Sequence, residues 1–291
     1  MFSQYFGQYL LDKGILSAVQ LQAVLAEEAS VRVKLGILAI DAGYMTPAEV
    51  ERVHELQKRY DKRFGELAIE RGLLREAEVA RLLEVQSQRY LQLSQAIVDQ
   101  GYLSLQQVDE ALSSYKEDNR LSAENLDALI KGDIDEIVRF SLDFGEVENA
   151  TCYQNYTALL LRNMVRFLGE TPVIIKRQSA EDKPYSWLIT QQIEGAGGLH
   201  TGLGLNEDVL LALAERYSGD DMPAVVDAYA KDCAAEFLNL TNGIFCVNAS
   251  NNSMELDLEL QHVEQQVAFP EKAAEEIVLR LSFGDISLLL A

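Results

Sequence analysis

Glycines recur every 29 residues through the first 115 residues of the chain. One series is Gly14, Gly43, Gly72 and Gly101, and a second series is Gly7, Gly36 and Gly65, with Ser94 in the fourth place. Self-similarity at a fixed period is typical of repeat architectures, in which each unit buries its apolar face only against its neighbours. The spacing therefore predicts four copies of one structural unit, and it constrains the fold more than any other feature.

Each repeat is predicted to be a hairpin of two helices. The units comprise residues 5–28, 34–57, 63–86 and 92–115, with five-residue spacers between them. A first short helix would end at the series that starts with Gly14, because the residue that follows a helix often needs a positive φ. In the second repeat Thr46 would cap the next helix, and Glu49 would complete a capping box.

The second helix of each unit carries an apolar stripe at positions i, i+3 and i+4. In two units the stripe residues are Val50, Val53 and His54, and Val79, Leu82 and Leu83. Because this spacing places them on one helix face, we expect that face to pack against neighbouring hairpins.

The rest of the chain has a mixed helix and strand pattern, and 291 residues predict about two domains. The predicted elements are a helix that ends at Gly169, strands over 173–178, 186–193 and 198–205, a helix over 207–217, a longer helix from 221 to about 241 that Gly243 ends, a hairpin of 244–250 and 254–262, and one or two strands within 276–290. Helices that cover one sheet are the simplest architecture for this order.

The predicted fold class is therefore a two-domain chain, all-α helical-hairpin repeats followed by an α+β domain. The repeats occupy residues 1–117 and the α+β domain residues 139–291. Between them, residues 118–138 are strongly charged, and Gly132 interrupts their helical pattern. We expect this segment to be a charged, partly helical linker.

The net charge disfavours several function classes. The formal net charge is −21, and residues 140–291 alone carry nine basic and 23 acidic groups. Such a surface repels phosphate backbones and anionic lipids, so a nucleic-acid polymer is not expected as a partner. Residues 31–92 are nearly neutral and could tolerate a small anionic ligand. With no signal peptide and no long apolar stretch, we expect a cytoplasmic protein without membrane insertion.

One group of polar residues is the candidate for chemistry. Asp232, Glu236 and Asn239 lie at i, i+4 and i+7 of the longer helix, so they share one face. A solvated polar face has the same spacing, and both interpretations stay open. The three cysteines lack CxxC spacing, and no HExxH, P-loop or GxSxG motif is present. We expect neither a metal site nor an intrinsic cofactor.

The two middle repeats resemble the MshE N-terminal domain, which is related to the N-terminal domain of type II secretion ATPases. That resemblance implies that these repeats bind cyclic di-GMP. The residues carried over are Lys34, Leu35, Gly36, Leu38, Gly43 and Gln57 in one unit and Arg63, Phe64, Gly65, Leu67, Gly72 and Gln86 in the other. Arginine can donate a fork of hydrogen bonds to guanine, whereas Lys34 offers only a point charge. The alternative is that the diverged repeats dock a protein of a secretion, pilus or motility apparatus.

The pattern of Asp232, Glu236, Asn239 and Gly243 resembles the signature of the CheC/CheX/FliY chemotaxis phosphatases, over about residues 145–265. The resemblance implies hydrolysis of the aspartyl phosphate of a CheY-like response regulator, which would itself hold the Mg²⁺. Asn239 would position the attacking water, Glu236 would pair with a lysine of the regulator, and Asp232 would support them. The family often has a proline where this chain has Gln261-His262. A homodimer is expected by the same analogy.

Two functions remain open from the sequence. The first is a signalling phosphatase whose N-terminal repeats sense cyclic di-GMP or a partner. The alternative is a non-catalytic adaptor that links a response regulator to a motility, pilus or secretion apparatus. Both would have the same fold.

Thermal melting with cyclic di-GMP tests the ligand hypothesis. A ligand that binds the native state, at about 100 times its dissociation constant, should stabilise the fold by about 2.7 kcal/mol. An unchanged melting temperature at saturating ligand would contradict the hypothesis.

Overall fold

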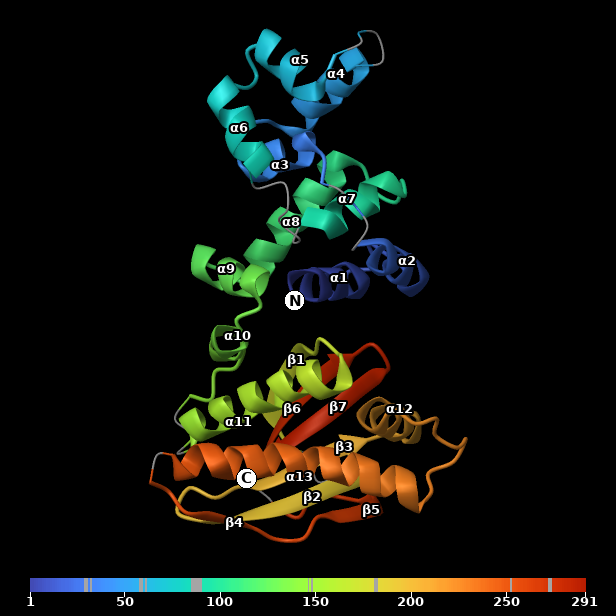
Figure 1. Cartoon of the computed structure of the whole chain (residues 1–291), viewed down its shortest axis with the longest axis vertical. Helices are drawn as coiled ribbons and strands as arrows, with labels where there is room; N and C mark the ends of the chain where they lie inside the picture. The colour runs from blue at the N-terminus through green and yellow to red at the C-terminus, as the bar shows by residue number, and fades with distance from the viewer. Residues whose placement is uncertain are drawn as a thin grey trace. The chain divides into compact units, whose positions relative to one another are not determined.

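The computed structural model describes residues 1–28, 31, 33–57, 60, 62–84, 91–145, 147, 149–180, 183–251, 253–271 and 274–291. These residues form two compact units, Met1–Gly132 and Asp133–Ala291 (Figure 1). The boundary falls inside the segment predicted as a linker, which contributes one helix to each unit.

The first unit is built from helices and has no strand among its described residues. The helices are α1 (Phe2–Asp12), α2 (Ala18–Glu28), α3 (Leu35–Asp41), α4 (Pro47–Gln57), α5 (Phe64–Glu70), α6 (Glu76–Glu84), α7 (Gln92–Asp99), α8 (Leu105–Asp118) and α9 (Ala123–Lys131). The glycine after the first helix of each 24-residue unit has a φ between +67° and +70°. Thr46 and Glu49 form the expected capping box, in which Glu49 accepts a 2.8 Å bond from the Thr46 N–H.

Two clusters of buried side chains stabilise the first unit. One cluster contains residues from α3, α4, α5 and α6 together with Leu91 and Leu105. In the other, the Tyr115 ring of α8 lies 5.4 Å from Phe6 and 5.2 Å from Tyr9 of α1, measured between ring centroids. The first and fourth 24-residue units therefore pack on each other. The predicted inward stripe is wrong for Leu83, which is 52% exposed.

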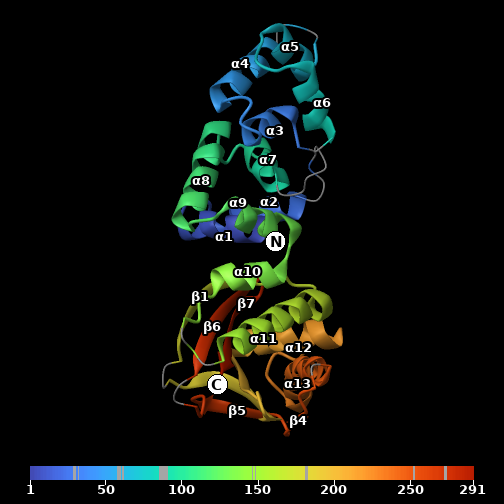
Figure 2. The ribbon, with the colours of Figure 1, turned by 90° about the vertical axis from the view of Figure 1, so that its left-hand side faces the viewer.

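The second unit contains a seven-stranded antiparallel sheet among its described residues, in the order β1-β6-β7-β3-β2-β4, with β5 also paired to β2. The strands are β1 (Val173–Ser179), β2 (Tyr185–Gly195), β3 (His200–Leu205), β4 (Leu256–Leu258), β5 (His262–Val267), β6 (Glu275–Leu281) and β7 (Gly284–Leu290). The helices are α10 (Ile134–Ser141), α11 (Ala150–Asn163), the π-helical turn η2 (Met164–Leu168), α12 (Glu207–Ser218) and α13 (Ala228–Ser250). Both views show α11, α12 and α13 on one side of the sheet (Figures 1 and 2).

The end of η2 and the start of α12 follow the sequence signals. Gly169 ends η2 with a φ of +67°. Asn206 caps α12, and its Oδ1 accepts a 2.8 Å hydrogen bond from the Val209 N–H. The strand predictions over 173–178, 186–193 and 198–205 correspond to β1, β2 and β3.

The longest helix, α13, differs from its prediction at both ends. It starts after Asp227, whose Oδ1 accepts a 2.8 Å bond from the Ala230 N–H, rather than at 221–223. It also continues through Gly243 to Ser250, so the predicted strand over 244–250 and its hairpin are wrong. Phe245 packs edge-on against Tyr156, with 5.4 Å between ring centroids. Phe245 and the buried Ala249 are four positions apart, so they lie on one face of a helix. Their packing extends the helix past the glycine.

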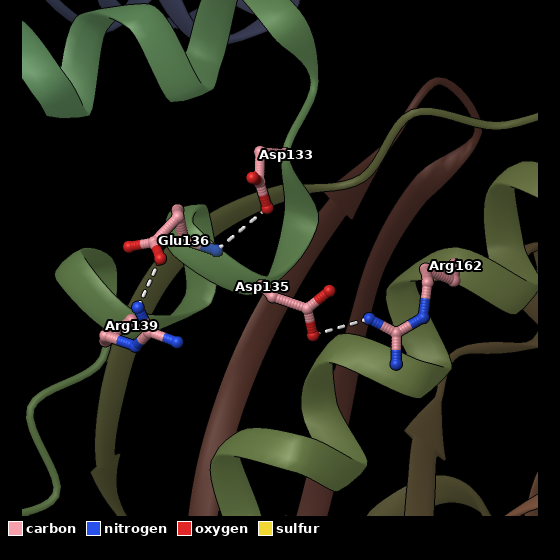
Figure 3. Close-up of polar contacts among 5 residues, drawn as sticks. All are labelled: Asp133, Asp135, Glu136, Arg139 and Arg162. Carbon is pink, nitrogen blue, oxygen red and sulfur yellow. Dashed lines mark hydrogen bonds and ion pairs between the residues drawn. The ribbon is translucent and has the colours of Figure 1, made fainter.

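Helix α10, predicted as part of the linker, belongs to the core of the second unit. Ile137 and Val138 are each 1% exposed. Figure 3 shows Asp135 of α10 in an ion pair with Arg162 of α11, at 2.6 Å between Oδ1 and Nη1. Acidic side chains at the start of the helix and buried residues behind them explain why a charged segment is ordered.

The sheet face away from α13 is closed by aromatic rings that need glycine beneath them. A Cβ at Gly202 would lie 2.8 Å from the Phe269 ring, and one at Gly204 would lie 2.3 Å from the Tyr185 ring. Real Cβ atoms do not approach other atoms so closely, so the rings can cover strand β3 only because it has no side chains at these positions.

Gly204→Ala should therefore destabilise the second unit by about 1–3 kcal/mol, since the Tyr185 ring would have to move. Urea unfolding with m-value analysis measures this. Gly243→Ala is the matched control, because the added Cβ would have no described neighbour outside its own helix backbone within 4 Å, and it should not destabilise the unit. Equal stability of the Gly204 variant and wild type would contradict this account of the packing.

Candidate functional site

Helix α13 presents different residues to the core and to the outside. Ala230, Ala234, Phe237, Leu238 and Thr241 are buried on one side. Asp232 and Glu236 are exposed, and Asn239 is half-buried between the two environments. The amphipathic spacing of the helix thus brings these three polar residues to one edge, as the sequence predicts.

Glu236 and Asn239 touch each other. Asn239 Nδ2 donates a 3.1 Å hydrogen bond to Glu236 Oε2, so the amide and the carboxylate are held side by side one turn apart. Asp232 lies one further turn toward the start of the helix, and no hydrogen bond among the described residues joins it to the other two. The pair is therefore the compact part of the site.

Strand β2, directly below α13, supplies a residue that the sequence interpretation missed. Gln191 Nε2 donates a 2.8 Å hydrogen bond to Asn239 Oδ1, although Gln191 itself is only 1% exposed. The one available signal was a pair of glutamines within the apolar strand sequence YSWLITQQIEG, since alternation turns one of two neighbours inward.

The two contacts leave Asn239 with unused hydrogen-bonding capacity. A carboxamide offers two N–H donors and two lone pairs on its oxygen. Because one donor is used by Glu236 and one lone pair by Gln191, one of each remains. The group can therefore accept a hydrogen bond from a water molecule and donate one to it at the same time.

Tyr217 of α12 lies close to the carboxylate of the site. Its ring packs edge-on against Phe237, with 5.8 Å between centroids. Burial, and then the negative charge of Glu236, raise the pKa of Tyr217 above its ordinary value. Tyr217 therefore keeps its proton at neutral pH and adds no charge beside Glu236.

In the first unit, the glycines proposed to approach a ligand are accounted for by helix packing. A Cβ at Gly36 would lie 2.5 Å from Val50 Cγ1, and one at Gly65 would lie 3.2 Å from Val79 Cγ1. The outer repeat shows the same geometry, because a Cβ at Gly7 would lie 2.8 Å from Leu21. Close approach of the two helices within each hairpin is thus sufficient to explain this series.

The remaining apolar residues and glycines proposed for cyclic di-GMP have structural roles in the first unit. Leu38 and Leu67 are 2% and 3% exposed and belong to the core, while Gly43 and Gly72 form turns with positive φ. Leu35 and Phe64 pack across the two middle repeats, against Gly65 and Gly36 respectively.

Polar residues of the same proposed site are accessible. Lys34 is exposed, and its Nζ lies 2.5 Å from Asp99 Oδ1 in an ion pair. Arg63 is exposed at the start of α5, and Gln57 Nε2 donates a 3.4 Å bond to the Lys62 carbonyl. Gln86 lies outside the described residues.

Among the residues that the structure describes, no group of three or more histidine, cysteine, aspartate or glutamate side chains is arranged to hold a metal ion. None of the described helices combines the length and the apolarity that crossing a membrane requires.

Comparisons with known proteins give no match to a family model. No curated protein matches the chain either. Solved structures that match about half of it include chemotaxis proteins. CheX from Desulfovibrio desulfuricans is 12% identical with a TM-score of 0.42, and the match covers 48% of this chain and 98% of that one. A CheC-like superfamily protein from a Shewanella species is 14% identical with a TM-score of 0.42, covering 46% and 92%. A complex of CheX with CheY, BeF₃ and Mg²⁺ from Borrelia burgdorferi is 12% identical with a TM-score of 0.38, covering 48% and 96%.

Proposed function

We propose that the second unit hydrolyses the aspartyl phosphate of a CheY-like response regulator. The observation that carries the proposal is the contact of Glu236 with Asn239 on the exposed edge of α13, at 3.1 Å, with a donor and an acceptor of Asn239 left for water. The resemblance of the residues 232–243 to the CheC/CheX/FliY signature supplies the substrate class.

The chemistry requires positioning more than a strong base. Water attacks the phosphorus, and the bond from phosphorus to the aspartate oxygen breaks. The products are the aspartate carboxylate of the regulator and inorganic phosphate, which carries the water oxygen and both of its protons. Phosphoryl transfer of this kind is catalysed mainly by alignment and charge stabilisation. The Asn239 amide would hold the water in line, and the regulator would bring its own Mg²⁺.

Glu236 would anchor the helix to the partner. A carboxylate has about four acceptor positions, so Glu236 can accept from Asn239 and from a lysine of the regulator together. Its exposure allows that lysine to reach it. The −14 formal charge of residues 140–291 would speed the approach of a basic surface, and Asp232 adds to it.

Loss of acyl phosphate from phosphorylated regulators tests the proposal. Asn239→Ala should lower kcat by about 100-fold while KM changes little, because the amide acts on the water. Glu236→Ala should chiefly raise KM, since the carboxylate binds the partner. Glu215→Ala, an exposed glutamate on α12, is the matched control and should behave as wild type.

A wild-type protein that binds a regulator but does not accelerate its dephosphorylation would contradict the phosphatase proposal. That result would favour the adaptor function instead.

Gly243 supports a partner surface on the same edge of α13. It lies one turn beyond Asn239, and a Cβ there would meet no described residue outside its own helix backbone within 4 Å. Glycine in a helix interior costs about 1 kcal/mol relative to alanine, and no packing within the described chain requires it. Close approach of a partner backbone would explain its presence.

Gly243→Ala should therefore raise the free energy of unfolding by about 0.5–1 kcal/mol and at the same time raise KM for the regulator. Chemical denaturation and steady-state kinetics measure the two effects. A stabilised variant with an unchanged KM would show that the partner does not approach this position.

For the first unit, cyclic di-GMP binding stays a prediction. The exposed Lys34 and Arg63 at the starts of α3 and α5 support it. The burial of Leu38 and Leu67 limits any such ligand to the exposed polar residues. Docking of a protein partner remains the alternative for this unit.

A further inference from the structure

Below Asn239, a chain of buried polar groups runs between α13, the sheet and α11. Gln191, Asn242, Thr201 and Tyr156 are each at most 1% exposed. Buried polar groups are costly unless they are hydrogen-bonded, so the directions of their bonds determine each other.

The direction of the chain is set by the backbone carbonyl of Glu259, which can only accept. Gln191 lies 2.8 Å from this oxygen, so the facing atom must be its Nε2 donor. The other side of the amide, Oε1, then accepts a 2.9 Å bond from Asn242 Nδ2. One backbone oxygen thus fixes which way the Gln191 carboxamide faces.

The far end of the chain agrees with this direction. Asn242 Nδ2 also donates to Thr201 Oγ1 at 2.9 Å. The Thr201 hydroxyl in turn donates to the backbone carbonyl of Gln191 at 3.0 Å. Asn242 Oδ1 accepts a 2.5 Å bond from the Tyr156 hydroxyl. Burial raises the pKa of Tyr156, so this hydroxyl stays a donor at neutral pH. Every donor of the two buried carboxamides has an acceptor.

Gln191 transmits this direction to the candidate site. Its second Nε2 hydrogen points at Asn239, 2.8 Å away, so the atom there must be Oδ1 and the Nδ2 group must face Glu236. A rotation of the Asn239 amide by 180° would set two donors against each other at Gln191 and an oxygen against the Glu236 carboxylate. An isolated asparagine has no such preference, because its two orientations are nearly equivalent.

We infer that Gln191 is a positioning residue, which holds the Asn239 carboxamide in the one orientation that presents its free acceptor and donor to the attacking water. This inference rests on the proposed function for its catalytic consequence. The orientation itself rests only on the hydrogen bonds of the folded chain.

The test compares Gln191→Met with Gln192→Met in the full-length protein. Methionine has a similar length and no N–H donor. Gln192 is the next residue of β2, and its Nε2 donates to the Ile193 carbonyl at 3.3 Å rather than to α13. Gln191→Met should lower kcat for dephosphorylation by about 10- to 100-fold with an unchanged KM, whereas Gln192→Met should leave both unchanged.

A second measurement does not depend on activity. NMR relaxation of the Asn239 side-chain ¹⁵N–H₂ group, without any partner, should show a rigid amide in wild type and in Gln192→Met and a mobile one in Gln191→Met. Thermal melting of the three proteins checks that the fold is retained.

The outcomes separate the inference from the proposed function. In an active protein, a kcat of Gln191→Met equal to that of wild type would overturn the inference. A fall in kcat accompanied by a rise in KM by the same factor would overturn it too. An equally rigid Asn239 amide in Gln191→Met would overturn it in any case. If wild type dephosphorylates no regulator but its Asn239 amide loosens only in Gln191→Met, the proposed function fails and the positioning stands.

Discussion

The register of α13 over β2 is the constraint on which the candidate site depends. The helix buries Leu238 and also Phe237, whose ring packs on Tyr217 of α12, and this burial fixes its rotation. At that rotation Asn239 lies above Gln191, and Glu236 lies beyond the edge in solvent. Apolar packing therefore sets the position of the polar pair, and the buried hydrogen bonds then set its orientation.

Glycine serves two different physical purposes in the repeats of this chain. The Gly14 series adopts a positive φ at turns, whereas Gly36 and Gly65 allow two helices to approach closely. Gly243 has neither purpose, because its φ is helical and its surroundings are open. The residue type alone does not separate these cases, although the 29-residue periodicity distinguishes the repeat glycines from Gly243.

The predictions fail where local signals compete with burial. Pro223 and Asp221 looked like a helix start, but Asp227 caps α13 instead. Gly243 looked like a stop, but the packing of Phe245 on Tyr156 continues the helix. Phe245 is half-buried, and its packing together with the burial of Ala249 offsets the roughly 1 kcal/mol that an internal glycine costs, so tertiary packing outweighs the local preference.

The sequence by itself determined the period of the first unit, the caps and turns that short-range hydrogen bonds fix, and the shared helix face of Glu236 and Asn239. These features depend on residues a few positions apart. Only the tertiary structure placed Gln191 under Asn239, 48 positions away, and linked it to Asn242 and Tyr156. No local pattern specifies such contacts, because the pairing of a helix with a strand is settled by the packing of the whole unit.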